Sequence, residues 1–196
     1  MRVALTIDTE HPSRPCSGGS LERILATLGE AGVRATFFIQ GRWASAYPDA
    51  ARAVQAGGHL IANHSHHHAP MNALTEAGFR EDVRDAEETI RAIIGVDPRP
   101  WFRCPFGAGK DDTRVLELLG ELDYRHVSWD VDPRDWDEGN AGTDVLASVL
   151  RGVEGREDSI VLLHSWPDAT GEALPQILAE LRAAGAELVD VSALVD

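Results

Sequence analysis

Cysteine and basic residues are scarce in this sequence, and both shortages limit what the chain does. The 196 residues include only 2 cysteines, Cys16 and Cys104, which are able to pair in an oxidising compartment but imply no disulfide framework. Lys and Arg number 18 against 32 Asp and Glu, so the formal net charge is -14. A charge of this sign disfavours nucleic acid and anionic membranes as partners. It fits a neutral or cationic ligand, and it equally fits simple solubility.

Long apolar runs are also lacking. No stretch approaches the roughly 20 consecutive apolar residues that a membrane-spanning helix needs, so we expect no membrane insertion. The chain goes directly into a strand pattern without a signal-peptide pattern, which predicts a cytoplasmic protein, although a secreted chain trimmed of its leader would look the same. The length predicts a single domain over residues 1–196.

Strand and helix patterns alternate along the chain. Helices are expected between the strands, with Ser20, Thr75 and Thr143 as N-caps and Pro48 in a first helical turn. Seven or eight such units predict a parallel α/β barrel smaller than the usual eightfold one, with a doubly wound open sheet as the alternative. The expected strands are residues 3–7, 35–39, 60–62, 101–104, 126–129, 160–163 and 187–191.

Four of the eight histidines fall within five consecutive positions, residues 64–68, directly after one of these strands. On a helical turn, His64 and His68 would share one face, with Cβ atoms about 5–6 Å apart. That spacing lets two imidazole nitrogens reach one metal ion at roughly 2.0–2.1 Å. Imidazole suits zinc, cobalt, nickel and iron, so the residue type narrows the metal only in part.

Polar residues also follow several other expected strands. Active sites of parallel barrels and open sheets collect at the C-terminal ends of the strands, so these residues predict one common site. They are Asp8, His64, Arg103, Asp132 or Asp135, and His164.

Short motifs around these residues stand in a fixed order, and together they resemble the polysaccharide deacetylase family, the NodB-homology domain of carbohydrate esterase family 4. The resemblance extends from residue 6 to residue 164 and implies a distorted, TIM-like (β/α)7-8 barrel that removes N-acetyl groups from sugars with the help of a metal. The motifs are Thr6-Ile7-Asp8-Thr9-Glu10, His64-Ser65-His66-His67-His68, Arg103-Cys104-Pro105-Phe106-Gly107, Asp132-Pro133-Arg134-Asp135-Trp136 and Leu162-Leu163-His164.

The resemblance implies catalytic roles that agree with the chemistry of the residues. Asp8 would accept the proton of the attacking water, and Arg103 would keep Asp8 ionised and oriented. His164 would protonate the departing amine. A carboxylate of the fourth motif, Asp135 or Asp132, would raise the pKa of His164 so that the ring starts as the cation.

One position departs from the family pattern. The first motif of the family usually reads Thr-Phe-Asp-Asp, with the second Asp as a metal ligand, and here that position is Thr9. We predict that Glu10 supplies the third ligand beside His64 and His68, because a strand points residues 8 and 10 to the same side. The alternatives are Asp8 itself, His11 or His66 as the third ligand, or a metal held by two histidines.

The remaining implications concern the substrate. Trp136 and Leu162 would wall the pocket for the acetyl methyl group, and the backbone N–H of Phe106 would stabilise the oxyanion. Trp166 would either stack on a sugar ring or pack under a loop, and Trp129 reads as core.

The predicted function is therefore a hydrolase that uses one divalent metal ion, Zn²⁺ with Co²⁺ or Ni²⁺ as alternatives, to remove N-acetyl groups from sugars. Chitooligosaccharides and peptidoglycan-type glycans are the usual substrates of the family, and a small soluble N-acetyl compound is an equal possibility. The alternatives are a deacetylase, amidase or esterase of a small non-sugar substrate and a silent module that binds carbohydrate or metal.

Overall fold

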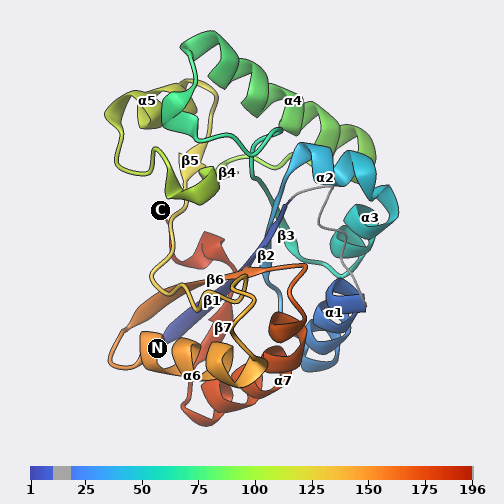
Figure 1. Ribbon diagram of the computed structural model, residues 1–196, viewed down its shortest axis with the longest axis vertical. Helices are drawn as coiled ribbons and strands as arrows, with labels where there is room; N and C mark the ends of the chain where they lie inside the picture. Colours follow the sequence, from blue (N-terminus) through green and yellow to red (C-terminus); the bar gives the residue numbers. More distant parts are fainter. Residues whose placement is uncertain (11–18, 196) are drawn as a thin grey trace.

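A curled sheet of parallel strands forms the centre of the molecule (Figure 1). The computed structural model describes residues 1–10 and 19–195. The strand order is β5-β4-β3-β2-β1-β6, and β7 pairs with β1 as well. The strands are β1 (Arg2–Thr9), β2 (Thr36–Ile39), β3 (Leu60–Asn63), β4 (Trp101–Phe102), β5 (Arg125–His126), β6 (Asp158–His164) and β7 (Glu187–Val189).

The sheet curls until its two edges approach each other. The segment that follows β5 continues towards β6, where Val131 forms a parallel bridge with Val161. The backbone N–H of Leu162 donates to the carbonyl of Val131 at 2.9 Å. This irregular closure makes a distorted barrel and confirms the predicted fold class, whereas the alternative of an open doubly wound sheet is wrong.

Residues of β1 alternate between two environments because successive side chains of a strand point to opposite faces. Val3, Leu5 and Ile7 belong to the large core between the sheet and the helices. Ala4 belongs to a smaller cluster inside the curled sheet, together with Phe38. Asp8 is on the same side of the strand as Ala4, so the concave side of the sheet is apolar at its base and carries charge at the carboxyl ends of the strands.

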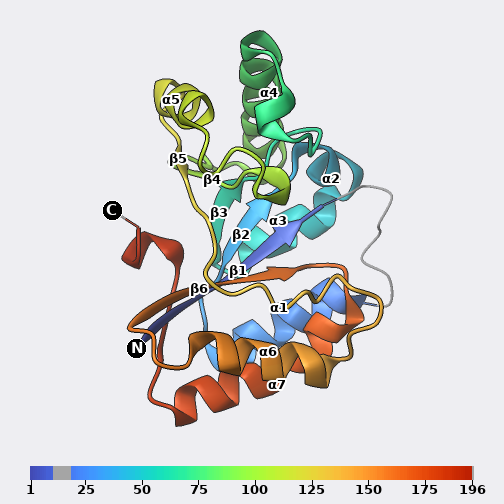
Figure 2. The same cartoon turned by 60° about the vertical axis from the view of Figure 1, so that its left-hand side comes forward.

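Helices cover the outer side of the sheet. Figure 2 shows α1, α6 and α7 together below β1 and β6, with α4 and α5 at the opposite end. Among the helices of the described ranges, none is both long enough and apolar enough to cross a membrane. The helices are α1 (Ser20–Ala31), α2 (Gly41–Ala46), α3 (Pro48–Ala56), α4 (Glu76–Ile94), α5 (Thr113–Glu121), α6 (Gly142–Val153) and α7 (Asp168–Ala183), with short 3₁₀ turns at Met71–Ala73, Pro105–Gly107 and Val191–Ala193.

The predicted helix starts are right in two of four cases. Thr75 caps α4 by accepting from the N–H of Gly78 at 3.2 Å, and Pro48 opens α3. Ser20 is not a cap, because it is already inside α1 and its hydroxyl donates to the carbonyl of Pro167 at 2.8 Å. Thr143 is likewise inside α6, where the carboxylate of Asp144 instead binds the N–H of the N-cap residue.

Candidate active site

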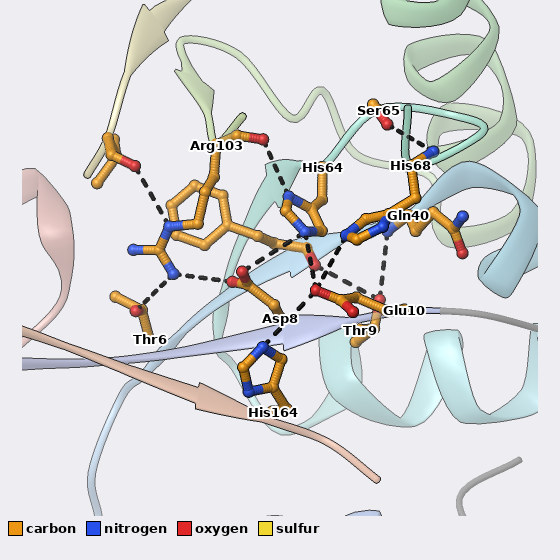
Figure 3. Close-up of polar contacts among 12 residues, drawn as sticks. Thr6, Asp8, Thr9, Glu10, Gln40, His64, Ser65, His68, Arg103 and His164 are labelled. Atoms are coloured by element: carbon orange, nitrogen blue, oxygen red, sulfur yellow. Dashed lines mark hydrogen bonds and ion pairs between the residues drawn. The ribbon is translucent and has the colours of Figure 1, made fainter. Parts of the chain in front are cut away.

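The two carboxylates of the site come from the end of β1. Asp8 and Glu10 are buried on the same side of the strand, as the alternation predicts. Thr9 faces the opposite way, where its hydroxyl donates to the carbonyl of Phe38 at 3.4 Å and accepts from the N–H of Gln40 at 3.3 Å. The strand geometry therefore removes Thr9 from the site and brings Glu10 into it (Figure 3).

The two histidines come from the loop after β3. Ser65 and His68 have positive φ angles of 64° and 59°, so this loop is a tight bend and the expected helical turn is wrong. The Ser65 hydroxyl accepts from the N–H of His68 at 2.9 Å, which closes the bend. The rings of His64 and His68 end with centroids 4.9 Å apart, so the sequence spacing of four still brings them together.

Glu10, His64 and His68 form a compact set of donor atoms. Oε1 of Glu10 is 3.0 Å from Nε2 of His68 and 3.4 Å from Nε2 of His64. Nδ1 of His64 donates to the carbonyl of Arg103 at 2.9 Å, which fixes the ring and turns Nε2 towards Glu10, the arrangement typical of a metal-binding histidine. The three donor atoms lie within 4.8 Å of one another and are buried.

The electrostatics of this donor set favour positive charge. Burial by itself would raise the pKa of Glu10, but hydrogen bonds from His64 and His68 outweigh it and hold that pKa well below its usual range. Burial would lower the pKa of His64, but the nearby Asp8 and Glu10 carboxylates outweigh it and raise that pKa. The site therefore stabilises a cation between its carboxylates.

The alternatives for the third ligand have different outcomes. Asp8, Glu10 and His164 form a second group whose donor atoms lie within 4.8 Å of one another, so Asp8 stays close to the same position. The ring of His66 instead packs against that of His67, with centroids 4.7 Å apart. His11 lies outside the described residues, as does Cys16, so neither His11 as a ligand nor a pairing of Cys16 with Cys104 is tested here.

Asp8 is held by a buried arginine. Nη1 of Arg103 donates to Oδ1 of Asp8 at 2.8 Å and to the hydroxyl of Thr6 at the same distance. Arg103 is completely buried, and its guanidinium also lies over the ring of Phe38, 4.0 Å from the centroid. The predicted pairing of Arg103 with Asp8 is therefore present, and Oδ2 of Asp8 remains 3.5 Å from Nε2 of His64.

Asp135, not Asp132, is the partner of His164. Nδ1 of His164 donates to Oδ1 of Asp135 at 2.7 Å, and Oδ2 of Asp135 accepts from the backbone N–H of His164 at 2.7 Å and from the hydroxyl of Thr170 at 2.6 Å. Burial would lower the pKa of His164, but the Asp135 carboxylate more than offsets it and raises that pKa to about 9. Nε2 of His164 lies 3.7 Å from Oε1 of Glu10, on the side of the donor set.

A cavity of about 350 Å³ opens above these groups. Phe106, Trp136 and Leu162 all line it, as predicted; Phe106 is 67% exposed and Leu162 only 4%. The residues that the sequence analysis missed or left open also line it: Trp129, which read as core, together with Cys104, Asp132 and Trp166. Cys104 and Asp132 belong to the motifs themselves, and Trp166 comes two residues after His164, so their places in the sequence are the signal that points to them.

The sequence model of the polysaccharide deacetylase family matches residues 1–127 of this chain. This chain belongs to the polysaccharide deacetylase family. The match includes the first three motifs, and with them Asp8, Glu10, the histidine pair and Arg103.

Similar proteins of the polysaccharide deacetylase family include enzymes and a pseudoenzyme. A chitooligosaccharide deacetylase of Azorhizobium caulinodans is 34% identical over 164 residues, covering 79% of this chain and 75% of that protein. The protein YlxY of Bacillus subtilis is 31% identical over 179 residues, covering 90% of this chain; the chain spans only 53% of YlxY. The crystal structure of BA3943, a pseudoenzyme of carbohydrate esterase family 4 from Bacillus anthracis, superimposes with a TM-score of 0.89 at 27% identity, covering all of this chain and 65% of that one.

Proposed function

We propose that this chain is a metal-dependent hydrolase that removes N-acetyl groups from N-acetylated sugars or oligosaccharides. The observation that carries the proposal is the arrangement around Glu10, His64 and His68. Asp8, a candidate base, lies 3.5 Å from the ring of His64, and His164, a candidate acid, lies 3.7 Å from Glu10. A base and an acid thus flank the same three donor atoms.

The donor set fits a divalent metal ion. Two imidazole nitrogens and one carboxylate leave coordination positions open, as in catalytic zinc sites. Zn²⁺ is the metal that we propose, with Co²⁺ or Ni²⁺ as alternatives, because the ligands are two histidines and one carboxylate. When bound, such an ion lowers the pKa of water and polarises the amide carbonyl.

The residues around the donor set divide the proton transfers between them. Asp8 accepts the proton of the attacking water, and its salt bridge to Arg103 fixes the direction of the carboxylate. His164 is protonated at neutral pH because its pKa lies near 9, so it delivers a proton to the departing amine. The backbone N–H of Phe106, at the rim of the cavity, is the proposed donor to the oxyanion.

The cavity supports a carbohydrate substrate. Leu162 and Trp136 supply apolar surface for the acetyl methyl group, and Phe106 and Trp129 add aromatic surface for a sugar ring. Chitooligosaccharides are the first substrates to test, because the relative from Azorhizobium caulinodans is a chitooligosaccharide deacetylase. A small non-sugar amide or ester is the alternative within the same chemistry.

A silent binding module is the second candidate. Thr9 occupies the position of a family metal ligand, and BA3943, which superimposes on the whole chain, is a pseudoenzyme. The structure favours the enzyme because Glu10 reaches both histidines from the next position along β1.

Zinc content and acetate release together test the proposal. We would measure both for the parent chain, Glu10→Ala and Thr9→Val, using N-acetylated chitooligosaccharides and an activated acetyl ester. The parent and Thr9→Val are expected to hold about one Zn²⁺ per chain and to release acetate, whereas Glu10→Ala loses both properties because one of its three ligands is gone. Thr9→Val is the matched control because it keeps the shape of a side chain that faces away from the donor set.

Each failure has a distinct meaning. A parent chain that binds zinc and releases no acetate from either substrate supports the silent module. Acetate release from the ester alone supports the small-substrate alternative. Glu10→Ala that keeps its zinc moves the third ligand to Asp8.

A further inference from the structure

Asp82 on α4 is a buried charged residue that the proposed chemistry does not use. Asp82 is only 5% exposed. Both of its carboxylate oxygens face the loop of residues 64–68, the histidine loop. Oδ2 accepts from the backbone N–H of His66 at 3.1 Å, and Oδ1 accepts from the backbone N–H of His67 at 2.9 Å. The carboxylate therefore binds the two residues that separate His64 from His68.

The histidine loop needs such support because its backbone is strained. Ser65 and His68 both occupy the left-handed region, which costs an L-residue about 1–2 kcal/mol. Four successive N–H groups, from Ser65 to His68, point at side-chain acceptors. Asn63 and Ser65 provide one acceptor each, whereas Asp82 provides two.

Asp82 also differs from those two residues in its place in the fold. Asn63 and Ser65 belong to the loop or to the strand directly before it, so their hydrogen bonds shape the loop locally. Asp82 is on α4, and its bonds fix the loop relative to the rest of the molecule. From the other side, the N–H of Gly41 at the start of α2 donates to the carbonyl of Ser65 at 3.0 Å. The loop is thus held between α2 and α4, which lie side by side in both views (Figures 1 and 2).

We infer that Asp82 is a positioning residue that holds His64 and His68 in the geometry for binding a metal ion. The inference rests on the proposed metal site, and it adds a residue outside the family motifs named above. A carboxylate suits this role because it has two strong acceptor oxygens and no donor, so it receives both N–H groups at once. An Asn side chain of the same shape keeps one acceptor and turns an NH₂ group towards the second backbone N–H.

The test compares Asp82→Asn with two other variants. Asp85→Asn is the matched control, because it removes one negative charge from the same helix, and Asp85 also lies within electrostatic range of His66. Asp82→Glu keeps the charge and both acceptor oxygens on a longer side chain. Zinc affinity is measured by competition with a chromophoric chelator, and site geometry is measured by the visible absorption spectrum of the Co²⁺-loaded chain.

Asp82→Asn is expected to weaken zinc binding about 10- to 100-fold, the usual effect of losing a residue that orients metal ligands. It also changes the Co²⁺ bands, whereas Asp85→Asn stays within twofold of the parent and keeps its spectrum. Asp82→Glu recovers at least part of the affinity. Thermal unfolding of the metal-free variants shows whether the fold itself is kept. If Asp82→Asn fails to fold, the zinc affinity and the Co²⁺ spectrum of Asp82→Glu test the role instead.

Two results would overturn the inference. Zinc affinity and Co²⁺ bands that are unchanged in Asp82→Asn remove the positioning role, and an equal loss in Asp85→Asn reduces the effect to general electrostatics. Neither readout needs catalysis. Weaker zinc binding in Asp82→Asn, in a chain that releases no acetate, would uphold the role of Asp82 while refuting the proposed deacetylase.

Discussion

The protonation of His164 depends on Asp135, and the substitution Asp135→Asn tests that dependence directly. In the folded chain Asp135 accepts hydrogen bonds from both the ring and the backbone N–H of His164 at 2.7 Å. The carboxylate outweighs the burial of the ring and raises the pKa of His164 from 6.5 to about 9. That step corresponds to about 3 kcal/mol in favour of the charged ring.

Without the charge of Asp135, burial lowers the pKa of His164, and only the carboxylates of Glu10 and Asp8 still oppose it. The His164 ring of Asp135→Asn should therefore titrate clearly below the value near 9 of the parent chain. The measurement is an NMR titration of the imidazole nitrogens in metal-free protein. Thr170→Val is the control, because it removes a hydrogen bond to Asp135 and keeps the charge, so its midpoint should stay well above the ordinary value.

The same substitution has a consequence for stability. A histidine whose pKa is raised on folding stabilises the folded chain fully below its unfolded pKa, and this contribution disappears as the pH rises through the folded pKa. The loss of unfolding free energy in Asp135→Asn should therefore be largest below pH 6.5 and should shrink towards pH 9. A His164 midpoint that remains near 9 in Asp135→Asn would refute this account of the site.

Two further predictions concern the buried Asp8–Arg103 pair and the packing around the histidine loop. Asp8→Asn should abolish acetate release while zinc stays bound, and retained turnover would exclude Asp8 as the base. The same substitution should lower the unfolding free energy by about 3–5 kcal/mol, because Arg103 is left as an unpaired buried charge. Gly41→Ala should lower the unfolding free energy, measured with urea, by about 1–3 kcal/mol, because its new Cβ would lie 2.4 Å from the ring of His66. Gly29→Ala in α1 is the control: its Cβ meets nothing within 4 Å, so the unfolding free energy should stay the same or rise. Equal stability of the two glycine variants would contradict the packing described here.

Much of the fold follows from patterns that act locally. The apolar strands and the helices between them are predicted by hydrophobic periodicity, and the parallel barrel follows from their alternation. Helix starts were harder, since Ser20 and Thr143 have the right residue type for a cap and lie inside their helices. A cap depends on where the preceding chain turns, and that is decided by packing with other segments such as the one around Pro167.

The sequence by itself determined which residues form the site. The carboxyl ends of parallel strands meet at one edge of a sheet, so Asp8, His64, Arg103 and His164 had to converge there. The alternation of side chains along β1 was enough to predict that Glu10, and not Thr9, faces the same side as Asp8. These conclusions need only the order of the elements and the period of a strand.

Only the tertiary structure decided which groups touch. Asp132 and Asp135 are three residues apart, and the path of the loop selects Asp135 for the ring of His164 and leaves Asp132 on the cavity wall. Thr170 and Asp82 lie outside the motifs. Each acts through a hydrogen bond to a segment that is distant in the sequence, so no local pattern points to it. Such contacts depend on how helices pack on the sheet, and a pattern read along one chain does not contain that information.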